Sequence, residues 1–394
     1  MARVTTEQRE SWQTPATWRW NTRELVLVAV LAVVFGFLYM QWVPLWVAAK
    51  GLGAQIGQEA LFGFWFVQLL EALLWIVLVA AISYYLDLVG RTYVLRRLLF
   101  FRRASQNLVS PPLGGEPRDR VIVSAHVDAP YTGAAYNDWA IRAFAGFRRL
   151  WPVRTSPQSI VFWSMALVLP PLGARMAGID ADWLSALQLP QTFALLVAAF
   201  FYGEIALSPI SPGANDNASG VAAALAVAER LRRNPPEALE VTLLLPGAGE
   251  TTRQGARSFI RSHRKALPRD RTWFIDIDSA GRGRARWVEL EVPVIAQPPD
   301  RTLAELAAAL AEGEERRSSL PLAPASAASL AGSYGYPAIA LTARESDGFV
   351  PVYHHRPEDD AAGVDPAAIE SVTSFAVDLV RLLDRDVARR RREG

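Results

Sequence analysis

The chain has 394 residues and a formal net charge of only +2, so charge alone gives no case for a nucleic-acid partner. It contains no cysteine, which excludes disulfide bonds, thiolate metal sites and cysteine nucleophiles. The length suits either two modest units or one domain with insertions, and a hydrophobic content of 51% is high for a soluble protein.

Four apolar stretches are long enough to cross a bilayer, for which about 20 residues suffice in a helix. The second stretch contains one acid, Glu71, and the third is interrupted by Pro170 and Pro171. Buried core helices are the alternative explanation. We predict about four transmembrane helices, within residues 25–49, 61–86, 155–174 and 183–203.

Arginine is concentrated on one side of these predicted spans. Five arginines follow the second span and four precede the third, whereas the two short loops within the pairs contain few basic residues. The positive-inside rule therefore places both termini and the polar part of the chain in the cytoplasm. The arginines are Arg91, Arg96, Arg97, Arg102, Arg103, Arg142, Arg148, Arg149 and Arg154.

The same pattern predicts the domain organisation. Residues 1–103 form an N-terminal region with two transmembrane helices, and residues 151–206 form an inserted transmembrane hairpin. Residues 104–150 and 207–394 together form one polar domain, in which residues 104–119 contain proline and glycine and are expected to be a loop.

Within the polar domain, short apolar runs alternate with amphipathic helical patterns. Strands are predicted at residues 121–125, 239–245, 273–277 and 338–342, and helices at 218–231, 252–267 and 366–383. This alternation favours an α/β fold with a mainly parallel mixed sheet and flanking helices.

Acids and histidines gather at or just after the predicted strand ends, where ligand groups converge in open α/β sheets. Carboxylate oxygens mixed with imidazole suit zinc, cobalt or manganese, and a bridging carboxylate can hold two such ions. His126 and Asp128 lie two residues apart, so on a strand Asp128 can support His126. The segments are 124–129 (SAHVDA), 213–220 (GANDNASG), 247–250 (GAGE), 276–281 (DIDSAG) and 353–360 (YHHRPEDD).

Each segment also has a purely structural explanation. Asn217 or Ser219 can cap the following helix, and Asp276 and Asp278 can be an exposed strand end. His354 and His355 can be surface residues. Three of the four histidines nevertheless lie in these segments, and the remaining one, His263, is expected to be solvated on a helix.

Taken together, the five segments resemble the M28 family of metallo-aminopeptidases over residues 120–135 and 210–385, with GANDNASG as the most specific part. The resemblance implies a zinc aminopeptidase-like α/β fold with two zinc ions. It assigns His126 and Asp278 to one ion, Glu250 and His355 to the other, and Asp216 as the bridge, with Asp128 orienting His126.

The chain departs from the family at the general base. The family has two adjacent glutamates, of which the first is the base, and Gly255 sets the register so that Gly249 takes the position of that base. No replacement is identified, although Glu204, Glu345 and Asp347 are candidates. A second departure is Ala327–Ala328, where the family often has Asp-His near the substrate.

We therefore expect a membrane-anchored M28-like metallopeptidase, an aminopeptidase that hydrolyses peptide bonds with metal-activated water, with its polar domain on the cytoplasmic side. The expected partners are a peptide substrate and the lipid bilayer, and no nucleic acid is expected. The inserted hairpin suggests that the peptide substrate is membrane-associated. A non-catalytic pseudopeptidase that binds metal and recognises a peptide or membrane partner is the alternative, and an amidohydrolase for non-peptide amides is a third. If only the base is missing, Gly249→Glu should raise activity.

Overall fold

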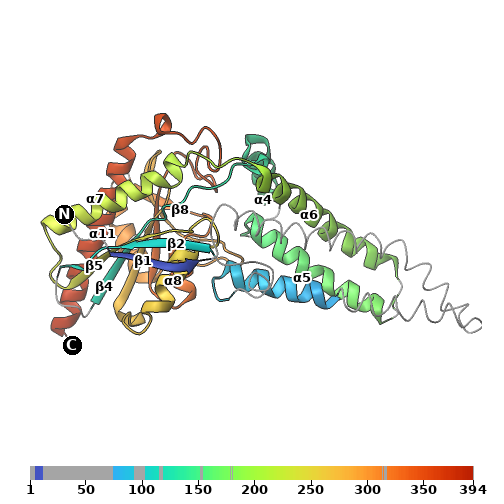
Figure 1. The fold of residues 1–394 in the computed structure, drawn as a ribbon, viewed down its shortest axis with the longest axis horizontal. Coiled ribbons are helices and arrows are strands. Elements are labelled where there is room, and N and C mark those ends of the chain that lie inside the picture. Colours follow the sequence, from blue (N-terminus) through green and yellow to red (C-terminus); the bar gives the residue numbers. More distant parts are fainter. Residues whose placement is uncertain are drawn as a thin grey trace, which may run out of the picture. The chain divides into compact units, whose positions relative to one another are not determined.

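The computed structural model describes residues 5–11, 74–92, 103–114, 119–150, 154–177, 179, 181–312, 314 and 317–393. The chain divides into two compact units. The polar unit comprises Met1–Trp18, Phe100–Ser156 and Ser208–Gly394, and the apolar unit comprises Arg19–Leu99 and Pro157–Leu207. Figure 1 shows the elements of both along the chain.

The polar unit is built on a nine-stranded mixed sheet with the order β1-β2-β5-β4-β6-β9-β7-β8, and β3 pairs with β5. Its centre is four parallel strands, β5 (Leu239–Pro246), β4 (Asp119–Ser124), β6 (Thr272–Ile277) and β9 (Ala338–Arg344). Almost every residue of these strands is buried, as the continuous apolar runs predict for a sheet covered on both faces. The predicted α/β class with a mixed sheet and flanking helices is confirmed.

The outer strands differ from expectation. The predicted loop at residues 104–119 is wrong, because β2 (Arg103–Val109) pairs antiparallel with both β1 (Thr5–Ser11) and β5, and β3 (Leu113–Gly114) follows it. The β2 sequence RASQNLV is too polar to show the alternation of apolar and polar residues that is typical of a half-buried strand. Pairing through backbone groups produces no recognisable pattern of residue types in the sequence. At the other edge lie β7 (Arg284–Val288) and β8 (Arg317–Leu320).

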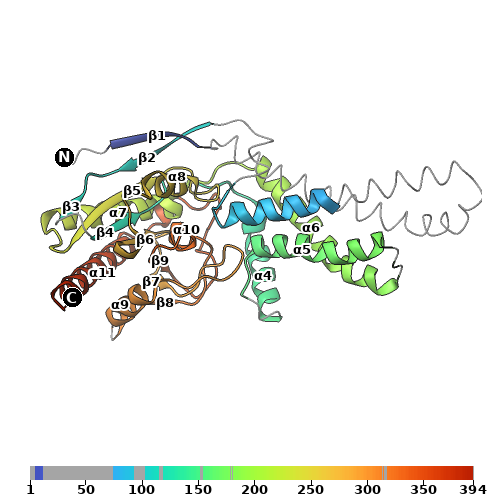
Figure 2. The same cartoon turned by 90° about the horizontal axis from the view of Figure 1, so that it is seen from below.

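Helices cover both faces of the sheet (Figures 1 and 2). One layer comprises α7 (Gly220–Arg233), α9 (Arg301–Ala311) and α11 (Pro366–Glu393), and the other comprises α8 (Gln254–His263) and α10 (Ala327–Ser333). Alternate strand residues contact opposite layers: Val121 and Val123 belong to the core formed with α7, α9 and α11, whereas Ile122 belongs to the core formed with α8 and α10.

The apolar unit contains three described helices, Leu74–Leu88, α5 (Pro157–Met176) and α6 (Asp182–Leu207). Ala81, Val161, Met165 and Leu195 form a small core among them. Within the described residues, α5 and α6 are long and apolar enough to cross a membrane by length and composition. The predicted span at residues 25–49 lies outside the described residues, and the one at 61–86 is described only from residue 74.

Two segments of the polar unit that lie on either side of α5 and α6 in the sequence, residues 130–132 and 209–211, pair with each other, and we call this pairing the clasp. Tyr131 and Ile210 form an antiparallel bridge. Thr132 N donates to Pro209 O at 2.9 Å, and Ser211 N donates to Pro130 O at 2.8 Å. The clasp therefore brings the segment after β4 beside the loop that precedes α7.

Candidate metal centre

The candidate ligands lie at the carboxyl ends of the parallel strands, as the strand order requires. His126 follows β4, Glu250 follows β5 and Asp278 follows β6. Asp216 lies in a short helical segment, η2 (Ala214–Ser219), ahead of α7, and His355 lies in the loop after β9. Segments far apart in the sequence thus converge, because parallel strands end at the same edge of the sheet.

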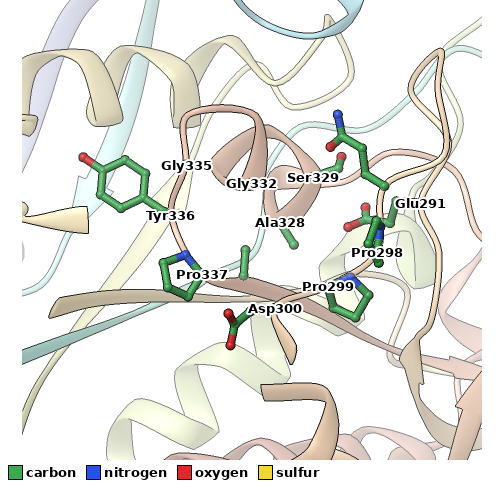
Figure 3. A pocket seen from close by; sticks show the side chains of 12 residues that line it. Glu291, Pro298, Pro299, Asp300, Ala328, Ser329, Gly332, Gly335, Tyr336 and Pro337 are labelled. Carbon is green, nitrogen blue, oxygen red and sulfur yellow. The ribbon is translucent and has the colours of Figure 1, made fainter. Parts of the chain in front are cut away.

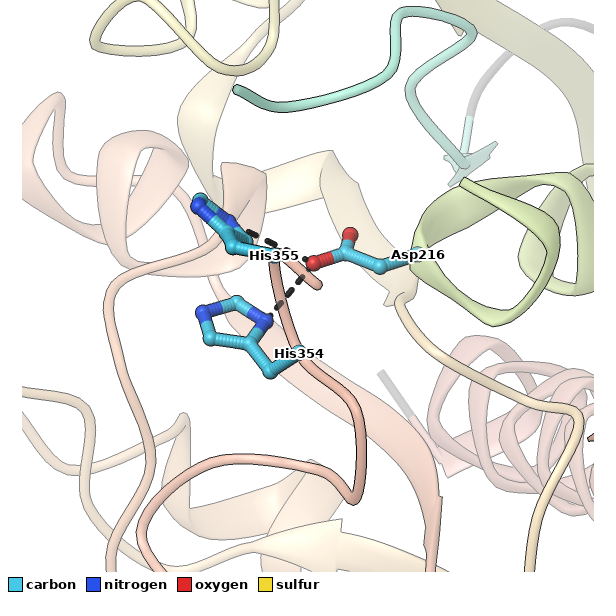
Figure 4. A group of neighbouring side chains, drawn as sticks. All are labelled: Asp216, His354 and His355. Carbon is cyan, nitrogen blue, oxygen red and sulfur yellow. Dashed lines mark ion pairs between the residues drawn. The ribbon is translucent and has the colours of Figure 1, made fainter. Parts of the chain in front are cut away.

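Asp216 is central among these groups and only 2% exposed. Its Oδ1 lies 3.5 Å from His126 Nε2, and its Oδ2 lies 3.5 Å from His355 Nε2. On the same side as His355, His354 Nδ1 lies 2.7 Å from Asp216 Oδ2, and Figure 4 shows both imidazoles facing this oxygen. The two carboxylate oxygens are therefore directed toward different histidines.

Glu250 also lies between the two histidine sides. Its Oε1 is 4.0 Å from His126 Nε2, and its Oε2 is 3.5 Å from His355 Nε2. Bonds of about 2.0–2.2 Å to a tetrahedral zinc ion place neighbouring donor atoms about 3.4 Å apart. Most of the observed separations match that spacing and exceed a hydrogen bond.

The grouping of the donor atoms provides an independent test of fit. Asp216, His354 and His355 form one close group, and His126, Asp216 and Glu250 form another. In each group the potential ligand atoms lie within 4.8 Å of one another. The donor set is therefore consistent with zinc.

Asp278 is less closely engaged than the other predicted ligands. Its Oδ1 accepts a hydrogen bond of 2.8 Å from Ser279 Oγ. In the part of the chain that the structure describes, no ion pair joins Asp278 to His126, and Asp278 belongs to neither close group of potential ligands. It is near enough for its charge to be one of the causes that raise the pKa of Glu250.

A dense hydrogen-bond network holds the Asp216 loop. The Asp359 carboxylate accepts from Asn215 N at 2.8 Å and from Asp216 N at 3.0 Å. Asn217 does not cap α7, because its amide donates to Ile277 O and accepts from Ser279 N, joining the loop to the end of β6. The loop is thus fixed to two other segments that carry candidate ligands.

Asp128 connects two candidate ligands. Its carboxylate accepts from Gly249 N at 2.6 Å and from Glu250 N at 2.9 Å. His126 Nδ1 lies 3.1 Å from the main-chain oxygen of Asp128 and 3.6 Å from its Oδ1. Asp128 therefore holds the turn before Glu250 as well as contacting the His126 ring.

Gly249 is in close contact with His126. A Cβ atom added at Gly249 would lie 2.4 Å from His126 Cβ and 2.6 Å from His126 Cγ, far inside van der Waals contact. The glycine thus provides the space that the imidazole occupies. A glutamate at this position would displace His126, so we no longer expect Gly249→Glu to raise activity.

The electrostatics of the site show an excess of buried negative charge. Burial, followed by the charge of Asp216, raises the pKa of Glu250 well above its ordinary value. Burial also raises that of Asp216, but contacts with His126 and His354 outweigh it and hold the pKa well below the ordinary value. Burial lowers the pKa of His126, yet Asp128 and Asp216 raise it well above its usual range. A cation would relieve this concentration of carboxylates.

The sequence analysis missed three contributors to the site. His354 was considered only as a possible surface residue, and Tyr136 belongs to no motif. Arg344 lies in β9, just beyond the predicted strand at residues 338–342. Burial lowers the pKa of Arg344 to about 10, while the charges of Asp278 and Asp216 oppose that shift. An arginine at the end of an apolar strand was the available signal for this buried positive charge.

The candidate replacement bases gain no support. Glu345 and Asp347 are exposed, and Asp347 is paired with Arg286. Glu204 lies in α6, within the other unit.

A separate hollow of about 300 Å³ lies beside α10 (Figure 3). Two buried carboxylates hold the start of this helix, since Glu291 accepts from Ser326 N at 2.5 Å and Asp276 accepts from Ala327 N at 2.9 Å. Burial raises the pKa of Glu291 to about 7 and that of Asp276 to about 6. Ala327 begins α10, and Ala328 lines the hollow, where the family resemblance leads one to expect polar residues.

Two family profiles match parts of this chain. Residues 202–380 match the profile of Peptidase family M28, and residues 23–87 match that of an ABC-type cobalt transport system, permease component. A search of curated proteins found no match.

Solved structures with detectable similarity are distant. The zinc aminopeptidase BSAP from Bacillus subtilis is 16% identical over 71% of this chain and 50% of that chain, with a TM-score of 0.44. An aminopeptidase from Aneurinibacillus sp. strain AM-1 is 15% identical over 71% of this chain and 48% of that chain, with a TM-score of 0.42. A Zn-dependent exopeptidase from Parabacteroides distasonis is 14% identical over 72% of this chain and 78% of that chain, with a TM-score of 0.40. The chain matches about half the length of the first two structures. The profile match over residues 202–380 supports the M28 peptidase family for this chain.

Proposed function

We propose that the polar unit is an M28-like metallopeptidase that holds two zinc ions and acts as an aminopeptidase. His126 and Asp278 bind one ion, Glu250 and His355 bind the other, and Asp216 bridges them. The observation that carries this proposal is the position of Asp216, whose two oxygens each lie 3.5 Å from a different histidine. The profile match to peptidase family M28 is consistent with it.

Zinc bound at such a centre lowers the pKa of water and polarises a peptide carbonyl. The residues of this chain position the groups around that chemistry. Asp128 holds His126 and the Glu250 turn together, and Asp359 holds the Asp216 backbone. Because Gly249 has no carboxylate, position 249 provides no acceptor for the proton of the attacking water. A positioned base contributes about 10²–10⁴-fold, so turnover should be slow.

A non-catalytic metal-binding protein is the second candidate, and one contact favours it. The His126 ring occupies the space into which a side chain at position 249 would project. The glutamate that the resemblance leads us to expect at this position would therefore clash with His126. Such a protein would bind a peptide or a membrane partner without hydrolysing it.

The apolar unit is proposed to anchor the protein in a membrane, with the polar unit on the cytoplasmic side. Support comes from α5 and α6, which are long and apolar enough to span, and from exposed aromatic residues on α6, with Phe193 at 68% and Phe200 at 65% exposure. Such residues favour a lipid environment over water. A membrane-associated peptide is the substrate that this anchoring suggests.

The test is metal analysis paired with a peptidase assay on the purified full-length protein in detergent. The proposal predicts two zinc ions per chain and slow release of amino-terminal residues from peptides, both reduced in His355→Ala. Two zinc ions with no turnover on a broad panel of aminoacyl amides would favour the non-catalytic protein. Absence of bound metal in the folded wild-type protein would contradict both.

A further inference from the structure

The contact between His354 and Asp216 is unusual among the polar contacts of the site. His354 Nδ1 and Asp216 Oδ2 lie 2.7 Å apart, which is the closest approach of any histidine nitrogen to this carboxylate. This distance is that of an ion pair or a hydrogen bond, and it holds the His354 ring against the carboxylate. Asp216, His354 and His355 together form a close group of side chains that could hold a metal ion.

The backbone around His354 is arranged so that consecutive imidazoles face the same side. Tyr353 has φ = 60° and His355 has φ = 56°, so left-handed residues flank His354 on both sides. A non-glycine residue in this conformation costs about 1–3 kcal/mol, and such residues concentrate at functional sites. As a result, the rings of His354 and His355 have centroids only 3.9 Å apart.

Tyr136 packs against both rings and keeps them in place. Its ring centroid lies 5.6 Å from that of His354 in an edge-on arrangement and 4.4 Å from that of His355. A ring held by packing is preorganised as a ligand, because binding then costs little rotamer entropy. His354 is thus not a surface residue whose orientation is free.

Resting on the proposed two-ion centre, we propose that His354 is a sixth protein ligand and binds the same ion as His355. That ion then has four protein donors, His354, His355, Glu250 and the Asp216 bridge, which fill a tetrahedral zinc site. The ion at His126 has only His126, Asp278 and Asp216 and keeps an open position for water. Four-ligand zinc sites are structural, and three-ligand sites are catalytic. The centre is therefore asymmetric, with one tightly held ion and one exchangeable ion.

The experiment measures zinc affinity and cobalt spectra of the full-length protein after removal of bound metal with a chelator. The variants are His354→Ala, His354→Gln and His355→Ala, and His263→Ala is the matched control because it removes the histidine on α8. Glutamine can still hydrogen-bond to Asp216 but is a poor zinc ligand, so it separates ligation from hydrogen bonding. Circular dichroism verifies that each variant is folded.

Wild type and His263→Ala are expected to bind one ion tightly and one weakly. Both His354 variants should weaken the tight site by more than about 100-fold, since even residues that only orient a ligand cost about 10–100-fold. They should also lose the cobalt absorption typical of a tetrahedral site. Wild-type affinities and spectrum in folded His354→Gln would overturn the inference while leaving the two-ion centre intact. A wild-type protein that binds no metal would refute the proposed function itself, and this inference with it.

Discussion

The two histidine sides of the centre are built in different ways. His126 follows a buried parallel strand, and its surroundings are backbone groups, the Asp128 carboxylate and the α-carbon of Gly249. His354 and His355 lie in a loop, and their surroundings are each other, Tyr136 and two left-handed residues. One side is positioned by the sheet and the other by local backbone conformation and aromatic packing.

This difference determines which substitutions each side of the centre can tolerate. The His126 side depends on the absence of a side chain at one position, so small additions there should damage it selectively. The His354–His355 side has no such restriction at its rings, but it has more imidazole donors and so should hold metal more firmly. Asp216 is shared, and its loss should affect both sides equally.

The largest effect is expected from Asp216→Asn, which removes the charge that both sides share. An amide is a much weaker zinc ligand than a carboxylate, and three nearby histidines lose their common partner. We expect both ions to be lost, with zinc content near zero by elemental analysis. Asp270→Asn, at an exposed residue, is the control. Retention of one full equivalent of zinc would show that the two sides do not share Asp216.

The next effect is expected from Gly249→Ala. The added methyl group would lie 2.4 Å from His126 Cβ, so His126 must move, and overpacking of this kind costs about 1–3 kcal/mol. We expect loss of the weakly bound ion with retention of the tight one. Gly146→Ala is the matched control because no heavy atom lies within 4 Å of the added Cβ. Unchanged binding of both ions would mean that the contact with His126 has no effect on the site.

A smaller effect on the same side is expected from Asp128→Asn. The amide can accept only one of the two backbone N–H groups of Gly249 and Glu250, which leaves the other unpaired at about 1–3 kcal/mol. Zinc affinity at the His126 side should fall about 10–100-fold. Asp300→Asn, which changes the cap of α9, is the control and should have wild-type affinity. Equal weakening of both ions would argue against the separation of the two sides.

The smallest effect on metal binding is expected at Glu291, which lies outside the centre and instead makes the stability of the protein depend on pH. Its pKa is raised from 4.5 to about 7 in the folded protein, so the folded state binds more protons than the unfolded state between these values. The free energy of unfolding should therefore fall as pH rises from 4.5 to about 7, by roughly 3 kcal/mol from this group.

Glu291→Gln should remove that loss. In metal-free protein its melting temperature should match wild type near pH 5 and exceed it near pH 8. A residual slope should persist from Asp276, whose pKa is raised to about 6. Parallel pH profiles for wild type and the variant would show that Glu291 titrates normally.

The central part of the fold was predictable because its strands are nearly continuous apolar runs. The predicted strands at residues 121–125, 239–245, 273–277 and 338–342 coincide with β4, β5, β6 and β9, except that residue 125 lies one position beyond the end of β4. Strand β2, which lies between β1 and β5, was not predictable, since its polar sequence pairs through the backbone and shows no apolar alternation. Its register becomes apparent only when β1 and β5 lie beside it.

The candidate site was predictable as a set of residue types at strand ends, and not as a geometry. The sequence suggests which acids and histidines converge, but the orientation of His354 depends on two left-handed residues that no residue type in YHHRPEDD requires. The contact between Gly249 and His126 joins residues more than 120 positions apart, and only the fold reveals it. In the sequence, Gly249 therefore appeared only as a lost base, whereas the structure shows that it also makes room for His126.

The clasp has a consequence for how much chain can be inserted beside the centre. Since Tyr131 and Ile210 are bridged, the segment after β4 and the loop before α7 are held together within the polar unit whatever lies between them in the sequence. Lengthening a loop whose ends are fixed costs little chain entropy, about 0.6 kcal/mol for each doubling of its length. The sequence between His126 and Asp216 can therefore include helices as long as α5 and α6 without separating these two candidate ligands.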